Sequence, residues 1–196
     1  MSAVLSPVLQ GPAISARGRF GEAVAALLQG GIQGHGPELA LHLSAAPDLH
    51  VLEHLQARHA RVVGAFLFER YAVITPLLED ASACASCFRR RFVSAPPPPY
   101  SVEFCESVIA NSERDPQFEY EGFLPSTARL VAELVLKSLD TPLVGATVID
   151  QFGAQHQGVP LLAVHGCRCR RVSGRSHAGP DRFTRHLLGD LPWPSH

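Results

Sequence analysis

The segment Ser82-Ala83-Cys84-Ala85-Ser86-Cys87-Phe88 holds two cysteines close together, and Cys167-Arg168-Cys169 holds a second pair about eighty residues later. Tetrahedral zinc binds four thiolates, and two cysteines two or three positions apart supply half of them from one tight turn. Two distant pairs would therefore tie one end of a domain to the other around a structural zinc ion. Two other interpretations stay open, namely free buried thiols and two redox-active pairs.

Composition and charge restrict the setting of such a site. A chain of 196 residues, 46% of them hydrophobic, suits one domain with a substantial core. The net charge of −1 gives no electrostatic reason to expect a nucleic-acid or membrane partner. No apolar run approaches the roughly 18 residues that span a bilayer, and residues 1–10 lack the pattern of a secretion signal. Together with the odd number of cysteines, this favours a reducing, cytoplasmic location.

The first forty residues predict a strand at 8–15, a glycine-containing turn at 16–21 and a helix at 22–29. Gly18 and Gly21 fit a dinucleotide-type glycine turn that is degenerate, because Ala16 occupies its first glycine position. They are the candidate cofactor-binding residues. Close packing of the helix on the sheet explains the same two glycines without a nucleotide.

The rest of the chain alternates strand and helix patterns. We predict a strand at 39–43, a helix at 47–59 and a hairpin formed by 62–68 and 71–77. Residues 100–122 predict a long loop with a helix at 102–110. The apolar stripe of Leu130, Leu134 and Val135 predicts a core-facing helix at 125–139, and a last hairpin is expected from 143–152 and 159–164.

Three further features have a functional and a structural interpretation. His165 is an alternative zinc ligand or a loop residue. Cys105 is a nucleophile or a small buried side chain. The basic run of residues 89–91 holds an acidic peptide or a phosphate, or it is a solvated helix face.

The order of these parts resembles the ThiF/MoeB family, the activating enzymes related to ubiquitin activation. The resemblance covers residues 8–171 and is strongest over 120–169. Besides the glycine turn and both cysteine pairs, it rests on Ala132-Glu133-Leu134-Val135-Leu136-Lys137 and Leu143-Val144-Gly145-Ala146. It implies an α/β fold, a truncated ThiF/Rossmann-like domain over residues 1–171 with a zinc–tetracysteine clasp and a degenerate nucleotide site. Residues 172–196 are expected to form a flexible tail.

Activating enzymes adenylate a carboxyl group, and the residues for that chemistry are incomplete here. Beyond Ala16, the family's asparagine–arginine pair is missing after the second predicted strand, and the stretch before Cys84 is short. A kept scaffold with a decayed nucleotide site is similar to the ThiF-like partner proteins of azoline-forming peptide cyclodehydratases, of the McbB and SagC type. Those proteins usually carry an N-terminal winged-helix module that binds the leader peptide, and nothing of that size precedes Val8.

This resemblance implies a non-catalytic subunit, with no catalytic residue of its own, that positions a ribosomally made precursor peptide. An ATP-using YcaO-type partner would form the thiazoline or oxazoline rings, and a flavin-dependent dehydrogenase is a further candidate partner in a homo- or hetero-oligomer. The alternative is an active adenylating enzyme of the ThiF/MoeB type that acts on a sulfur carrier or a peptide carboxylate. A third interpretation is a free-standing zinc-binding interaction domain.

Overall fold

The computed structural model describes residues 11–79, 83–141, 145–153, 155–164, 166, 167 and 169. A seven-stranded sheet runs through the molecule in the order β1-β2-β3-β4-β6-β7, with β5 paired to β3. The first three strands are parallel, and the later pairs are antiparallel. The strands are β1 Ala13–Arg17, β2 Leu39–Ser44, β3 Arg61–Phe68, β4 Tyr71–Ile74, β5 Leu78–Glu79, β6 Gly145–Asp150 and β7 Gln155–Pro160.

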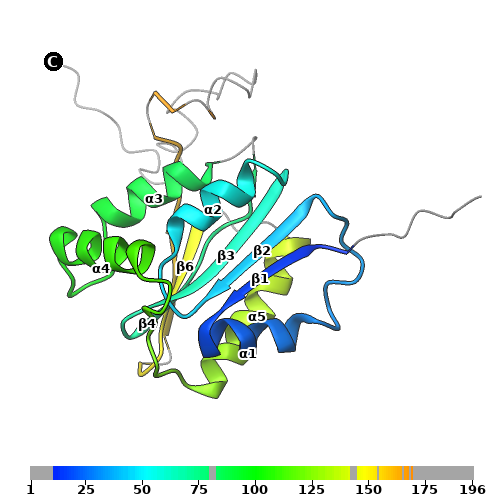
Figure 1. The fold of residues 1–196 in the computed structure, drawn as a ribbon, viewed down its shortest axis with the longest axis horizontal. Helices are drawn as coiled ribbons and strands as arrows, with labels where there is room; N and C mark the ends of the chain where they lie inside the picture. The colour runs from blue at the N-terminus through cyan, green and yellow to red at the C-terminus, as the bar shows by residue number, and fades with distance from the viewer. Residues whose placement is uncertain are drawn as a thin grey trace, which may run out of the picture.

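Helices cover both faces of the sheet (Figure 1). One face packs against α1 (Gly18–Leu28) and α5 (Pro125–Asp140). The other face packs against α2 (Leu49–Gln56), α3 (Ala85–Ser94) and α4 (Val102–Arg114). Because β2 and β3 lie between two helical layers, nearly all of their side chains are buried, as expected of parallel strands.

The connections between the three parallel strands have an unusual handedness. The strand order β1-β2-β3 means that both crossovers step in the same direction across the sheet. The helix of the first crossover, α1, lies on one face, and the helix of the second, α2, lies on the other. The two crossovers therefore have opposite hands, so one of them departs from the right-handed rule.

The structure corrects the predicted boundaries of the first and last strand pairs. The first strand covers Ala13–Arg17, not 8–15, and α1 begins directly at Gly18, so the glycine turn is the first turn of the helix. The last strand, β7, covers Gln155–Pro160 rather than 159–164. The backbone N–H groups of Phe152 and Gly153 donate to the Asp150 carboxylate, which reverses the chain early. Polar residues then suit β7, because it is an exposed edge strand.

The predicted helix at 125–139 is confirmed as α5, but the residues that face the core differ from those predicted. Val131 and Val135 of α5 are fully buried between α1 and the sheet, whereas Leu130 and Leu134 are partly buried at its margin. The predicted helix at 102–110 is the longer α4, and its Ser101 side chain caps the first turn by accepting a hydrogen bond from Phe104 N at 3.2 Å.

Within the described residues, no helix is long and apolar enough to cross a bilayer. The sequence predictions for residues 8–10, 143–144, His165 and the tail at 172–196 lie outside the part of the chain that the structure describes.

Candidate functional site

The start of α3 presents the first cysteine pair. Cys84 is the N-cap residue, and Cys87 lies in the first helical turn with its side chain buried. The N–H of Ala85 donates to Gln56 Oε1 at 2.7 Å, which fixes this end of α3 on α2. A helix N-terminus favours anions, so this position stabilises thiolates.

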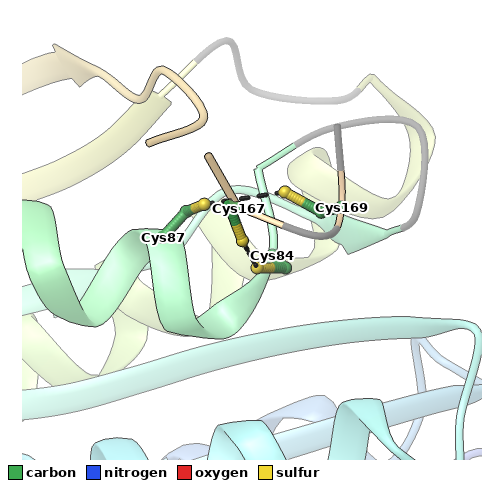
Figure 2. A group of neighbouring side chains, drawn as sticks. All are labelled: Cys84, Cys87, Cys167 and Cys169. Atoms are coloured by element: carbon green, nitrogen blue, oxygen red, sulfur yellow. Dashed lines mark hydrogen bonds between the residues drawn. The ribbon is translucent and has the colours of Figure 1, made fainter. Parts of the chain in front are cut away.

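The second pair meets the first across a long stretch of sequence (Figure 2). Cys84 Sγ lies 3.6 Å from Cys167 Sγ, and Cys87 Sγ lies 3.6 Å from Cys169 Sγ. All four sulfur atoms lie within 4.8 Å of one another. Four thiolates at about 2.3 Å from a tetrahedral zinc ion are about 3.8 Å apart. The four predicted ligands are thus brought together at a spacing that could hold a metal ion.

Backbone hydrogen bonds shape the second pair. Cys167 N donates to Val164 O at 3.1 Å across a turn in which Gly166 has φ 78°. Val164 N donates to Cys87 Sγ at 3.2 Å, a bond that stabilises a thiolate. A backbone hydrogen bond from Cys169 lowers the pKa of Cys167 to about 7, whereas burial raises the pKa of the Cys84 thiol. Four ionised thiolates in this space need a cation among them.

The two glycines of the turn pack against their surroundings. Gly18 has φ 67°, and a Cβ added there would collide with the carboxylate of Glu119 and lie 2.7 Å from Ala45 Cβ. A Cβ at Gly21 would collide with the carbonyl oxygen of Leu43. Gly18 therefore permits the left-handed backbone of the turn, and Gly21 lets α1 approach β2 closely.

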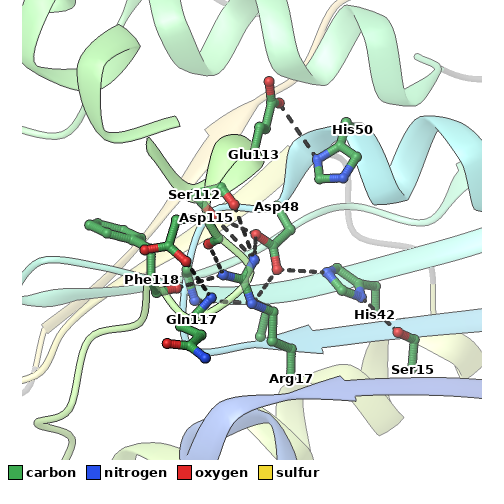
Figure 3. A network of polar contacts seen from close by, with 12 residues as sticks. Ser15, Arg17, His42, Asp48, His50, Ser112, Glu113, Asp115, Gln117 and Phe118 are labelled. Carbon is green, nitrogen blue, oxygen red and sulfur yellow. Dashed lines mark hydrogen bonds and ion pairs between the residues drawn. The ribbon is translucent and has the colours of Figure 1, made fainter. Parts of the chain in front are cut away.

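A buried ion pair lies beside this turn, at the carboxyl ends of β1 and β2 (Figure 3). The guanidinium of Arg17 donates to Asp48 Oδ1, and Ser44 Oγ donates to Asp48 Oδ2 at 2.7 Å. Ser112 Oγ on α4 also donates to Oδ1, and His42 Nε2 lies 3.5 Å from Oδ2. Burial raises the pKa of Asp48, but the polar contacts with these four side chains outweigh it and lower the pKa to about 2.

The connection between α4 and α5 covers the same place. Arg17 Nη2 donates to Phe118 O at 2.7 Å and to Asp115 O at 2.9 Å, and Tyr120 N donates to Ala45 O at 2.9 Å. In a doubly wound sheet, ligands bind outside the carboxyl ends of the strands where the strand order reverses. Among the strands that the structure describes, the order does not reverse at β1, and the chain's own residues occupy that position.

Sequence reasoning did not identify this Arg17–Asp48 pair. A signal was present, because Arg17 lies in the turn after the first predicted strand and Asp48 lies at the start of the helix predicted after the second. The carboxyl ends of parallel neighbours meet at one edge of a sheet, so opposite charges there are expected to pair. The contribution of Ser112 comes from α4 and had no such signal.

The other candidates take structural positions. Cys105 is fully buried beneath α3, and burial raises the pKa of its thiol to about 11, which suits a core side chain rather than a nucleophile. Arg89 forms an ion pair with Glu113 on α4, whereas Arg90 and Arg91 are exposed.

A solved structure of a peptide-modifying complex has a similar fold. One chain of the E. coli microcin synthetase McbBCD complex matches with a TM-score of 0.59 at 10% sequence identity, over 86% of this chain and 72% of that chain. The chain shares its fold with a microcin synthetase chain. The resemblance that the sequence suggested is thus confirmed for the fold.

Two heterocyclases match over a smaller part of their length. The heterocyclase TruD gives a TM-score of 0.50 at 17% identity, over 82% of this chain and 27% of its own. A heterocyclase in complex with substrate and cofactor gives 0.51 at 13% identity, over 96% of this chain and 28% of its own. The chain therefore spans about a quarter of those two proteins. No protein-family model matches the sequence, and no curated protein matches it significantly.

Proposed function

We propose that this protein is a non-catalytic subunit of an azoline-forming cyclodehydratase complex. It positions a ribosomally made precursor peptide for a YcaO-type partner that uses ATP. The observation that carries the proposal is a glycine turn closed by the chain's own side chains, on a fold shared with a microcin synthetase chain.

The electrostatics of the turn support a role without nucleotide. Phosphate-binding glycine turns present backbone N–H groups at a helix N-terminus to an anion. In this chain the Glu119 carboxylate lies against Gly18, where its charge would repel a phosphate. Asp48, the acidic side chain after β2, is 1% exposed and already bonded to Arg17, Ser44 and Ser112. It is therefore not free to bind a ribose.

A structural zinc ion is part of the proposal, with Cys84, Cys87, Cys167 and Cys169 as ligands. The sulfur spacing and the N–H donated to Cys87 Sγ both fit this ion. Bound zinc would hold the segment after β7 against the start of α3. With all four ligand positions filled by protein, such a site stabilises the fold and leaves no position for a substrate.

In the proposed reaction, a Cys thiol or a Ser or Thr hydroxyl of the peptide adds to the carbon of the preceding carbonyl group. The carbonyl oxygen then leaves, with net loss of one water, and the YcaO-type partner uses ATP to drive this loss. The contribution of this chain is to orient the peptide. Holding two reacting groups together removes entropy from the barrier, an effect of about 7 kcal/mol or more in well-oriented systems.

The test is reconstitution of azoline formation from this chain, a YcaO-type partner and a candidate precursor peptide. Mass spectrometry follows the loss of about 18 Da per ring, with this chain present and absent. We expect rings only when it is present. The isolated chain should neither hydrolyse ATP nor exchange pyrophosphate. Pyrophosphate exchange that Gly21→Ala abolishes would instead support the adenylating-enzyme alternative.

A further inference from the structure

The cysteine cluster has the geometry for a second chemistry, in which disulfides form between the two segments that meet there. Cys84 Sγ lies 3.6 Å from Cys167 Sγ, and the same distance separates Cys87 Sγ from Cys169 Sγ (Figure 2). A disulfide holds its two sulfur atoms at about 2.05 Å, so each pair has to approach by about 1.5 Å. Rotation of the side chains can supply a movement of this size.

Hydrogen bonds hold the backbones of both segments close to the cluster. Ala85 N donates to Gln56 Oε1 at 2.7 Å, which fixes the start of α3, and Val164 N donates to Cys87 Sγ at 3.2 Å, which brings the segment after β7 to it. Cys84, Cys167 and Cys169 are half-buried, whereas Cys87 is buried. A small oxidant dissolved in water can therefore reach the cluster, and the backbone need not rearrange for the sulfur atoms to react.

The spacing of the cysteines decides which of them pair. Four sulfur atoms form two disulfides, so a bond between Cys84 and Cys87 leaves Cys167 only Cys169 as a partner. A bond between Cys167 and Cys169 closes a ring over a single intervening residue, where the usual disulfide dihedral and Cα separation are difficult to reach without strain. Pairing between the segments avoids this ring and uses the two 3.6 Å contacts.

We propose that hydrogen peroxide or another hydroperoxide converts this cluster into two disulfides, Cys84–Cys167 and Cys87–Cys169. In each pair, one thiol attacks a peroxide oxygen and becomes a sulfenic acid, with release of one water from hydrogen peroxide. The second thiol attacks the sulfenic sulfur and releases a second water. Two thiols and one hydrogen peroxide thus give one disulfide and two waters, and two electrons pass from sulfur to oxygen.

Oxidation of this kind exchanges one link between the segments for another. A metal ion held by the four thiolates is released, because disulfide sulfur is a poor ligand for it. The new bonds join residues that are 83 and 82 positions apart, so they restrict the unfolded chain and stabilise the fold. The thiols and the metal content then respond to an oxidant while the fold persists. This inference depends on the positions of the sulfur atoms, not on the proposed cyclodehydratase role.

The test treats the purified, reduced full-length chain with hydrogen peroxide and counts its thiols after denaturation. We expect the five thiols to fall to one, because Cys105 is fully buried on α4, outside the cluster. Circular dichroism should be retained, and the urea midpoint should exceed that of the chain reduced with dithiothreitol and freed of metal by a chelator. Dithiothreitol should restore all five thiols. Cys105→Ala is the matched control and should end with no thiol and the same disulfides.

Trypsin separates the possible pairings, because Arg168 lies between the second two cysteines. The proposed disulfides join three tryptic peptides, residues 71–89, 138–168 and 169–170, into one species. Pairing within each segment would leave 71–89 free of the other two. Fragmentation between Ala85 and Ser86 then shows whether Cys84 carries the long peptide, as proposed, or the dipeptide.

Four results would overturn the proposal. The first is a 71–89 peptide with an internal disulfide, and the second is the dipeptide on Cys84. The third is oxidation of the four cysteines to sulfinic acids or to disulfides between chains, seen by mass and on a non-reducing gel. The fourth is loss of the circular dichroism signal once the disulfides have formed.

Discussion

The carboxylate of Glu119 lies directly against Gly18, although the two residues are about a hundred positions apart. Gly18 opens α1 with a positive φ, and Glu119 comes from the connection between α4 and α5. A turn that a nucleotide-binding protein would leave open to phosphate is thereby closed by a negative side chain. This contact accounts for the glycine at position 18 in a turn proposed to bind no nucleotide.

The glycines are therefore expected to act on stability. Gly21→Ala forces α1 away from the carbonyl oxygen of Leu43, and Gly18→Ala adds a Cβ in a left-handed conformation. Each should cost about 2 kcal/mol or more, which lowers the melting temperature by roughly 4–8 °C. Gly30→Ala is the control, because an added Cβ has nothing within 4 Å. Equal melting temperatures for Gly21→Ala and Gly30→Ala would contradict close packing at Gly21.

The Asp48 carboxylate should make folding sensitive to acid. Its folded pKa of about 2 lies below the unfolded value near 3.9. Its contribution is complete above about pH 5 and is lost as the pH falls through 2. The shift corresponds to about 2 to 3 kcal/mol. Urea unfolding of the wild type and of Asp48→Asn should therefore converge between pH 5 and pH 2, and loss of metal in acid affects both proteins.

At neutral pH, Asp48→Asn should be less stable than the wild type by about 3 kcal/mol, because it leaves the Arg17 charge without its buried partner. Glu22→Gln on the exposed side of α1 is the control and should change the free energy of unfolding by less than about 0.5 kcal/mol. If Asp48→Asn leaves the free energy of unfolding unchanged, the hydrogen bonds of Ser44 and Ser112 alone hold the segments around residue 48 together.

Metal analysis should find about one zinc ion per purified chain. Cys84→Ser and Cys169→Ser should each lose the metal and much of their solubility, because a structural zinc site contributes directly to folding. Cys105→Ala provides the comparison, since Cys105 is buried under α3 and outside the cluster. It should keep its zinc. Full zinc content after replacement of both Cys84 and Cys87 would rule out the four-thiolate site.

The orientation of α5 predicts a graded response to charge. Val135→Asp should unfold the domain, because the side chain is fully buried and an unpaired core charge costs several kcal/mol. Leu134→Asp should be milder, since Leu134 is partly buried at the margin of the same cluster. Glu133→Asp on the exposed side should be nearly neutral. Circular dichroism and thermal melting distinguish these cases, and a soluble, stable Val135→Asp protein would refute the packing.

The sequence by itself determined the helices and strands whose hydrophobic residues recur at a regular spacing. It also identified the four cysteines that could bind a metal ion. The stripe of Leu130, Leu134 and Val135 predicted α5, and the apolar runs on either side of Glu69 and Arg70 predicted the β3–β4 hairpin. Local periodicity records which face of a segment is apolar, so it predicts such elements well. Periodicity did not predict the bounds of the polar strand β7, because an edge strand in water needs no apolar face.

Only the tertiary structure decided what surrounds each candidate residue. The spacing of Cys84 and Cys87 suggested half of a site, but the approach of Cys167 and Cys169 depends on how the chain returns after β7. Likewise, the sequence pattern of the glycine turn is the same whether the turn is open to a phosphate or closed by a side chain. Glu119 closes the turn, and Ser112 binds Asp48 beside it, from segments that come near only after folding. Contacts between distant segments leave no periodic trace in a single sequence.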